Sequence, residues 1–127
     1  MRILVVDDEP LVATTLGLIF RRQGFDVEVV ASAAAALHAI MLTAPDLVLC
    51  DIDMPSRDGV SLMAELGVVL PACPILVLTG HYSSLARVHQ CAATLPQSVR
   101  IVTKPCQPED LLRAAGDILS SFSTPVR

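Results

Sequence analysis

Two acidic residues, Asp51 and Asp53, follow the apolar run Leu47 to Cys50, and the sequence offers chemistry most clearly at this point. A short run that is apolar throughout is typical of a strand buried on both faces of a parallel sheet. Asp51 is therefore expected at the C-terminal tip of a strand, which is the edge where open parallel sheets bind ligands. A single aspartate in such a place can also simply cap a strand or the next helix. The residue types at the ends of the other predicted strands distinguish between these two interpretations.

Three other strand-like runs also end in polar residues. Because the carboxyl ends of parallel strands meet at one edge of a sheet, we expect these polar residues to lie near Asp51. Polar side chains on four apolar strands favour a binding site over a cap. The runs and the residues that end or follow them are Arg2 to Val6 with Asp7 and Asp8, Ile75 to Leu78 with Thr79 and Gly80, and Val99 to Thr103 with Lys104.

These residue types can bind a cation and a phosphoryl group. Three adjacent carboxylates repel one another, so they either share protons or hold a cation, and oxygen ligands without His or Cys favour Mg²⁺. A carboxylate beside Mg²⁺ can attack an activated phosphoryl group and form an acyl phosphate. Lys104, the Thr79 hydroxyl and the Gly80 backbone N–H could then contact the phosphoryl oxygens. The predicted metal ligands at this stage are Asp7, Asp8 and Asp51.

Helix signals separate the strand-like runs. Pro10 is placed to open a helix that ends at Gly24, Ser32 can cap an Ala-rich helix, and Pro108 can open the last helix. Strands and helices thus alternate through the chain, and short connections between them require right-handed crossovers around a parallel sheet. The sequence predicts an α/β fold with helices on both faces of the sheet.

The first predicted helix has two apolar faces. Helical spacing predicts that one face packs on the sheet, and this face contains Val12, Leu16, Ile19 and Phe20. The outer face contains Leu11, Thr14 and Leu18. Exposed apolar residues of this kind are either incidental or part of a docking surface for a partner, and the spacing alone leaves both interpretations open.

Length and composition limit the function further. The chain has 127 residues, which predicts one domain over residues 1–127 with a frayed tail from about residue 120. Hydrophobic residues make up 53% of the chain against 17% charged, which suits a sheet covered by helices. The net charge of −4, without a basic stripe, argues against direct binding of nucleic acid.

The compartment is predicted from the cysteines and the apolar runs. Four cysteines are scattered without a C-x-x-C pair, and no signal peptide is recognisable, so the chain is expected in the reducing cytoplasm. The run from Ala31 to Leu42 is interrupted by His38 and is too short to span a bilayer. We therefore expect no insertion into a membrane.

Taken in order, these motifs resemble the receiver domain of two-component response regulators over nearly the whole chain. The family has an acidic pair after its first strand, a phosphoacceptor aspartate closing the third, Thr or Ser ending the fourth and Lys-Pro after the fifth. The resemblance implies a flavodoxin-like (βα)5 three-layer sandwich, with a parallel five-stranded sheet of order 2-1-3-4-5. The matching positions are Asp7-Asp8, Asp51 with Met54-Pro55-Ser-Arg-Asp58-Gly59, Thr79 and Lys104-Pro105.

The resemblance also implies roles for individual residues. Asp51 would take a phosphoryl group from a phosphohistidine, in a Mg²⁺-dependent reaction that the chain itself promotes together with dephosphorylation. Asp8, Asp51 and the backbone carbonyl of Asp53 would bind Mg²⁺ directly, and Asp7 would act through a water. His81 borders the site in this family, so it and Asp53 are expected to set the lifetime of the phosphate. The phosphoryl-binding residues would be Asp53, Met54, Thr79, Gly80 and Lys104.

Partners follow from the same resemblance. A histidine kinase or a histidine phosphotransfer protein would donate the phosphoryl group and dock on Leu11, Thr14 and Leu18. Phosphorylation would shift the conformation for a downstream effector that the sequence does not identify, and could also promote a homodimer. The chain could be a stand-alone receiver or a receiver cut from a longer regulator.

The sequence departs from the family at the expected output face. Ile101 stands three residues before Lys104, where the family often has a Tyr or Phe that moves when the phosphate binds. Tyr82 could replace this aromatic switch, or it could simply pack at the start of its helix. The segment between Thr79 and Lys104 is also longer than we expect for the family. Phosphorylation could therefore be intact while signal transmission differs.

Two other classes of function remain as alternatives. Asp51-Ile-Asp53 superficially matches the nucleophile motif of haloacid dehalogenase-like phosphatases, but Pro55 stands where those enzymes usually have Thr or Val. Their acidic metal pair also comes late in the chain, whereas Asp7-Asp8 comes first. The second alternative is a phosphorylation-independent adaptor that uses the same fold only to bind partners.

Overall fold

The structure is a computed structural model, and it describes residues 1–53 and 59–123. Five strands alternate with five helices in this part of the chain. The elements are β1 (Arg2–Val6), α1 (Pro10–Arg22), β2 (Asp26–Val30), α2 (Ala33–Leu42), β3 (Leu47–Asp51), α3 (Gly59–Val69), β4 (Ile75–Thr79), α4 (Tyr82–Thr94), β5 (Val99–Thr103) and α5 (Pro108–Ser123).

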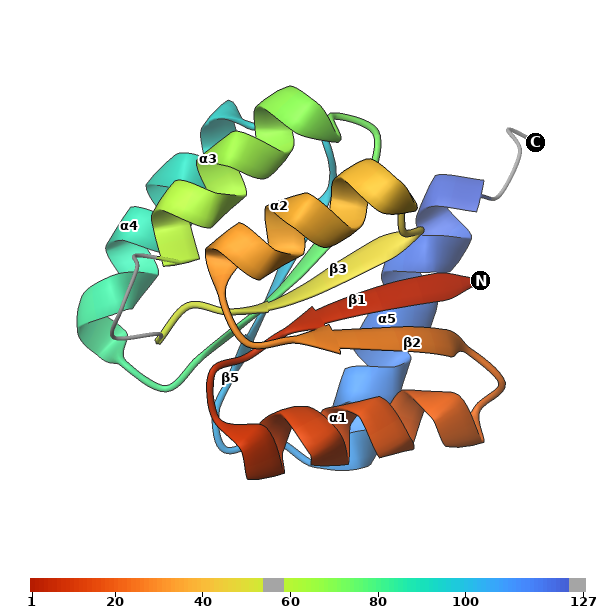
Figure 1. Cartoon of the computed structure of the whole chain (residues 1–127). Coiled ribbons are helices and arrows are strands. Elements are labelled where there is room, and N and C mark those ends of the chain that lie inside the picture. The colour runs from red at the N-terminus through yellow and green to blue at the C-terminus, as the bar shows by residue number, and fades with distance from the viewer. Residues whose placement is uncertain (54–58, 124–127) are drawn as a thin grey trace.

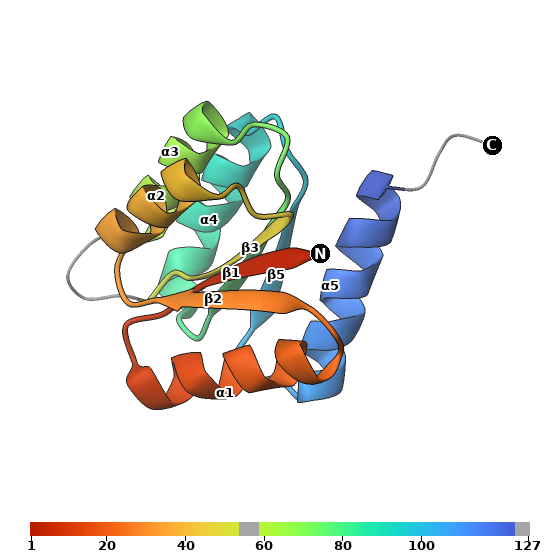
Figure 2. The same cartoon turned by 45° about the vertical axis from the view of Figure 1, so that its right-hand side comes forward.

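All strand pairs in the sheet are parallel, and the strand order is β2-β1-β3-β4-β5. Helices α1 and α5 cover one face of the sheet, and α2, α3 and α4 cover the other (Figures 1 and 2). The predicted flavodoxin-like three-layer sandwich and its strand order are therefore confirmed. This order reverses direction between β1 and β3, and open α/β sheets bind ligands outside such a point.

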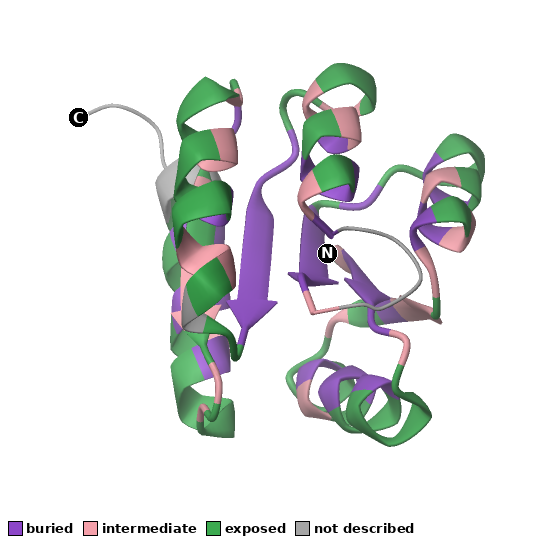
Figure 3. Cartoon of the chain, turned by 90° about the vertical axis from the view of Figure 1, so that its left-hand side faces the viewer, coloured by how far each residue is buried: buried purple, intermediate pink, exposed green. Residues whose placement is uncertain are grey.

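The core has two halves, one on each face of the sheet. Successive residues of a strand point to opposite faces, so each central strand contributes to both halves. In β1, Ile3 and Val5 pack with α1 and α5, while Leu4 and Val6 pack with α2, α3 and α4. Strands β3 and β4 are buried along their whole length (Figure 3). Burial on both faces explains why these strands read as continuous apolar runs.

Helix α1 corrects one expectation from the sequence. Val12 was expected on the packing face, but it is 36% exposed, and the buried residues of the helix are Ala13, Leu16, Gly17 and Phe20. Small residues allow the close approach: a Cβ added to Gly17 would lie 3.2 Å from a Val29 methyl group. Val12 is one residue before Ala13, which rotates it about 100° away from the buried stripe.

Local helix signals mostly act as predicted. The Ser32 side chain accepts a hydrogen bond of 3.0 Å from the Ala35 N–H and caps α2. Gly24 ends the first helical unit with a φ of +92°, a backbone conformation that favours glycine. Helix α5 continues to Ser123, so residues 120–123 are helical rather than part of the expected frayed tail.

The short connection between α4 and β5, residues 95–98, is anchored on α3. The Gln97 side chain is 7% exposed, and its Nε2 donates hydrogen bonds of 3.3 Å and 3.1 Å to the carbonyl oxygens of Leu66 and Leu70. The Leu66 carbonyl also accepts the Leu70 N–H at 2.9 Å, whereas the Leu70 carbonyl lies just past the last turn of α3, where a helix leaves acceptors without partners of its own. In the part of the chain that the structure describes, no helix is long and apolar enough to cross a membrane.

Candidate functional site

The C-terminal edge of the sheet gathers the polar residues that the sequence singled out. Asp51 and Thr79 are the last residues of β3 and β4, and both are buried. Asp7 follows β1 directly, and Lys104 follows β5 directly. The rigid central strands thus fix side chains that are far apart in the sequence at one position.

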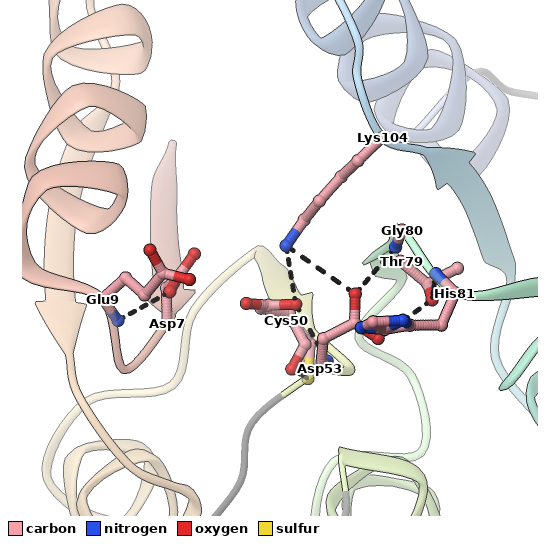
Figure 4. A network of polar contacts seen from close by, with 9 residues as sticks. Asp7, Glu9, Cys50, Asp53, Thr79, Gly80, His81 and Lys104 are labelled. Atoms are coloured by element: carbon pink, nitrogen blue, oxygen red, sulfur yellow. Dashed lines mark hydrogen bonds and ion pairs between the residues drawn. The ribbon is translucent and has the colours of Figure 1, made fainter.

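Asp7, Asp8 and Asp51 form an acidic cluster. One carboxylate oxygen from each lies within 4.8 Å of those of the other two. Asp7 Oδ1 accepts a hydrogen bond of 2.9 Å from the Glu9 N–H (Figure 4). Asp7 Oδ2 is buried and has no hydrogen-bond partner among the described residues. Burial, and then the nearby charges of Asp51 and Asp8, raise the pKa of Asp7 to about 6.

A divalent cation fits this cluster. Asp7 Oδ2 lacks a donor among the residues that the structure describes, and the clustered negative charges of the three aspartates repel one another unless they are neutralised. The available ligand atoms are carboxylate oxygens, the type that Mg²⁺ prefers. The acidic pocket could therefore bind a metal ion.

Lys104 brings a positive charge to Asp51 from the other side. Its Nζ lies 3.1 Å from Asp51 Oδ1 and 3.9 Å from Asp53 Oδ2. Partial burial alone would lower the pKa of Lys104, but the hydrogen bond to Asp51 and the charges of Asp51, Asp53 and Asp7 raise it. The ammonium group stays charged and holds the Asp51 carboxylate in place.

Asp53 contacts the ends of both β3 and β4, and the sequence did not reveal these contacts. Its backbone N–H donates a hydrogen bond of 2.9 Å to Asp51 Oδ1. Its carboxylate accepts hydrogen bonds from the Thr79 hydroxyl, at 3.1 Å, and from the Gly80 N–H, at 2.7 Å (Figure 4). Asp53 therefore connects the tips of β3 and β4 through its side chain.

Cys50 precedes Asp51 and offers no competing nucleophile. Burial, and then the charges of Asp51 and Asp7, raise the pKa of the Cys50 thiol to about 12. A fully buried thiol with such a pKa remains protonated and unreactive near neutral pH. None of the four cysteines, all of which lie in the described part of the chain, forms a disulfide bond.

His81 lies at the border of the site. Its backbone N–H donates a hydrogen bond of 3.3 Å to Thr79 Oγ1, while the residue as a whole is exposed. It lines a cavity of about 60 Å³ together with Thr79, Gly80, Leu85, Thr103 and Lys104. The sequence analysis missed Leu85 and Thr103, although Thr103 could have been found as the last residue of its strand.

The predicted docking residues lie on α1, and Ile101 lies on β5. Leu11 and Leu18 are 85% and 48% exposed on the outer face of α1, and Thr14 is exposed there too. Ile101 is half-buried and packs on the core side that contains α4. Met54 lies outside the described residues, and so does the side chain of Tyr82.

Comparison with known proteins agrees with this fold and with the predicted family. The family model described as the response regulator receiver domain matches residues 3–116. The transcriptional regulatory protein GlrR of Escherichia coli is 35% identical over 117 residues, which cover 92% of this chain and 26% of that protein. The DNA-binding response regulator MtrA of Mycolicibacterium smegmatis is 35% identical over 115 residues, covering 87% of this chain and 47% of that protein.

Solved structures extend the similarity to three dimensions. A CheY-like response regulator receiver domain protein from Methanospirillum hungatei superimposes with a TM-score of 0.86 at 27% identity, covering 95% of this chain and 94% of that one. The signal receiver domain of a histidine kinase from Syntrophus aciditrophicus gives a TM-score of 0.84 at 29% identity, covering 98% and 94%.

Together these findings define the chain as a signalling domain of the two-component type. It belongs to the response regulator receiver domain family. The chain spans about a quarter of the length of GlrR and about half that of MtrA.

Proposed function

We propose that Asp51 accepts a phosphoryl group from a phosphohistidine of a partner protein in a Mg²⁺-dependent reaction. The observation that carries this proposal is the placement of the Asp51 carboxylate. It is 2% exposed, lies in the acidic cluster with Asp7 and Asp8, and has the Lys104 ammonium 3.1 Å from one oxygen. A carboxylate held between a cation site and a fixed positive charge is suited to attack phosphorus.

Asp8, Asp51 and the backbone carbonyl of Asp53 would hold the metal directly, and Asp7 would act through a water. Bound Mg²⁺ supplies positive charge that screens the repulsion between the attacking carboxylate and the phosphoryl oxygens. Lys104 steadies the Asp51 carboxylate before attack and then neutralises a phosphoryl oxygen. The Thr79 hydroxyl and the Gly80 N–H donate hydrogen bonds to the other phosphoryl oxygens.

The direction of signalling follows from the same site. A histidine kinase or histidine phosphotransfer protein docks on the outer face of α1 and presents its phosphohistidine to Asp51. Phosphorylation draws Thr79 and Lys104 towards the phosphoryl group and shifts the conformation of the chain for a downstream effector or for homodimer formation. Ile101 takes the place of the aromatic residue that commonly moves in this step.

Labelling with acetyl phosphate tests the proposal. The unaltered chain should gain one phosphoryl group in the presence of Mg²⁺ and none in the presence of a chelator. Asp51→Asn should remain unlabelled while keeping its fold by circular dichroism. Repeated turnover of a generic phosphate ester would instead favour a phosphatase, and full signalling by Asp51→Asn in the cell would favour an adaptor that needs no phosphorylation.

A further inference from the structure

The carboxylate of Asp53 is already bound to hydrogen-bond donors. Its Oδ1 accepts from the Thr79 hydroxyl at 3.1 Å, and its Oδ2 accepts from the Gly80 N–H at 2.7 Å. The Lys104 ammonium lies 3.9 Å from the same Oδ2 and forms an ion pair with it. Two neutral donors and one cation thus converge on a single side-chain anion (Figure 4).

These donors are the ones that a phosphoryl group on Asp51 would need. The Lys104 ammonium reaches both carboxylates, at 3.1 Å from Asp51 and 3.9 Å from Asp53, so the two anions share one cation. The Gly80 N–H carries a single proton, and its short bond to Asp53 leaves none for a second acceptor. The Thr79 hydroxyl likewise carries one proton, so the Asp53 carboxylate and a phosphoryl group cannot hold the Gly80 N–H and the Thr79 hydroxyl at the same time.

We propose that the Asp53 carboxylate is an internal anion that occupies the phosphoryl-oxygen donors of the resting chain and must leave them before Asp51 can be phosphorylated. This inference rests on the proposed phosphoacceptor function of Asp51. It gives Asp53 a gating role, in addition to its backbone role at the metal. The residue touches the donors themselves, so it controls whether they are free to bind.

The side chain is able to leave. The Asp53 side chain is 12% exposed, so its carboxylate already reaches solvent in part and can turn towards it once a stronger anion competes for the donors. The apparent affinity of a site is reduced by the fraction of molecules in which the site is open. The negative charge of Asp53 also repels an approaching phosphodonor. Both effects slow the reaction with a small anionic donor.

The first measurement is the rate of labelling by acetyl phosphate in saturating Mg²⁺. Asp53→Asn keeps the size of the side chain and removes its charge, so the labelling rate should rise by about tenfold, as for a site that is open in about one molecule in ten. Glu109→Gln is the matched control: Glu109 is exposed in the first turn of α5, at the same edge of the sheet, and this variant loses the same charge. Its rate should stay close to that of the unaltered chain.

The second measurement needs neither Mg²⁺ nor a phosphodonor. The amide proton of Gly80 is bonded to a charged acceptor at 2.7 Å, so its NMR resonance should move upfield in Asp53→Asn and in Asp53→Ala. Other amides of the sheet should stay in place, which shows that the variants are folded. An unchanged Gly80 resonance in both variants would overturn the inference.

The labelling rates separate failure of the inference from failure of the proposed function. Equal rates in the unaltered chain and Asp53→Asn, or an equal rise in Asp53→Asn and Glu109→Gln, would contradict occupation of the donors by Asp53. If no protein is labelled, the phosphoacceptor function of Asp51 fails, and the Gly80 resonance still decides whether Asp53 occupies the donors.

Discussion

Asp7 combines deep burial with an unmet hydrogen-bonding requirement. It is 1% exposed, and one of its carboxylate oxygens has no donor within the described part of the chain. Its raised pKa, about 6 against an ordinary value of 3.8, means that the folded chain binds a proton at Asp7 more tightly than the unfolded chain does. The contribution of Asp7 to stability is therefore greatest below about pH 4 and is lost as the pH rises to about 6.

Replacing Asp7 should therefore stabilise the metal-free chain. In the absence of divalent cations, Asp7→Asn should raise the free energy of unfolding by about 1–3 kcal/mol at pH 7.5. The gain should shrink as the pH falls from 6 to 4, because the carboxylate is then protonated and no longer repels its neighbours. Urea unfolding at several pH values measures this dependence. A gain that is independent of pH would contradict it.

The same substitution should remove stabilisation by Mg²⁺. Ligands that bind only the folded state stabilise it, so the unaltered chain should gain stability with Mg²⁺ and Asp7→Asn should gain much less.

His81 should influence the lifetime of the phosphate. It borders the cavity beside Thr79 and Lys104, where a water could approach the acyl phosphate. His81→Ala is expected to change the dephosphorylation rate several-fold while leaving Asp51 able to be labelled. Asp53→Asn is expected to change the rate as well, because its carboxylate lies at the same donors. The loss of label after removal of the donor measures both, and unchanged kinetics in both variants would refute the assignment.

At the scale of residues, the positions of the candidate site residues could be predicted from the sequence, but the hydrogen bonds between their side chains could not. Asp7, Asp51, Thr79 and Lys104 could be placed together because each ends or follows an apolar strand, and parallel strands share one carboxyl edge. The position of the Asp53 carboxylate depends on a side-chain rotamer and on the backbone after β3. Neither of these is set by a spacing rule, so its bonds to Thr79 and Gly80 needed coordinates.

Among the elements, α3 depends on a close approach at its first residue. A Cβ added to Gly59 would lie 2.7 Å from the Ile52 Cα and 3.0 Å from the Ile52 carbonyl oxygen. Backbone atoms cannot move aside as a flexible side chain can, so Gly59→Ala should lower the free energy of unfolding by about 2–4 kcal/mol. Chemical denaturation measures the change.

Gly116 provides the matched control for this prediction. It also lies in a helix, but a Cβ there would meet nothing within 4 Å. Gly116→Ala should therefore raise the free energy of unfolding by about 0.5–1 kcal/mol, through helix propensity alone. Similar effects of the two substitutions would contradict the close approach at Gly59.

The outer face of α1 is expected to bind the phosphodonor protein. Leu18 is 48% exposed there, so Leu18→Asp should leave the fold intact. We expect it to slow phosphoryl transfer from the cognate partner by about tenfold or more, through loss of an apolar contact, and to leave labelling by acetyl phosphate nearly unchanged. Leu42→Asp is the control, because Leu42 is 74% exposed at the end of α2, on the opposite face of the sheet. Equal slowing with both donors would exclude docking at Leu18.

The elements themselves were largely predictable, and the failures have a physical cause. Strands β3 and β4 are fully buried, so each has a continuous apolar run that predicts a strand from the sequence alone. The packing face of α1 was assigned partly wrongly. A pattern of apolar residues favours the larger Val12 over the small residues Ala13 and Gly17 as a buried position. Close packing against β2 instead selects the small residues.

In the whole molecule, the candidate site lies at the C-terminal edge of the sheet. The expected output face, which includes Ile101, involves β5 and the neighbouring helix α4. Ile101 on β5 packs on the same core side as α4, where the family often carries an aromatic residue. The connection from α4 to β5 is fixed to α3 through Gln97, a contact that the sequence did not predict. The fold therefore brings the predicted acceptor residues together, and we expect signal transmission from them to differ from the common pattern of the family.

The position of the phosphoryl group is the most direct test of the account. After Mg²⁺-dependent labelling with acetyl phosphate, reductive trapping with borohydride and peptide mapping by mass spectrometry should locate the modified side chain at Asp51. The label should be absent from Asp51→Asn and from the unaltered chain treated with a chelator. Labelling of another residue, or equal labelling of Asp51→Asn, would contradict the central claim that Asp51 is the phosphoacceptor.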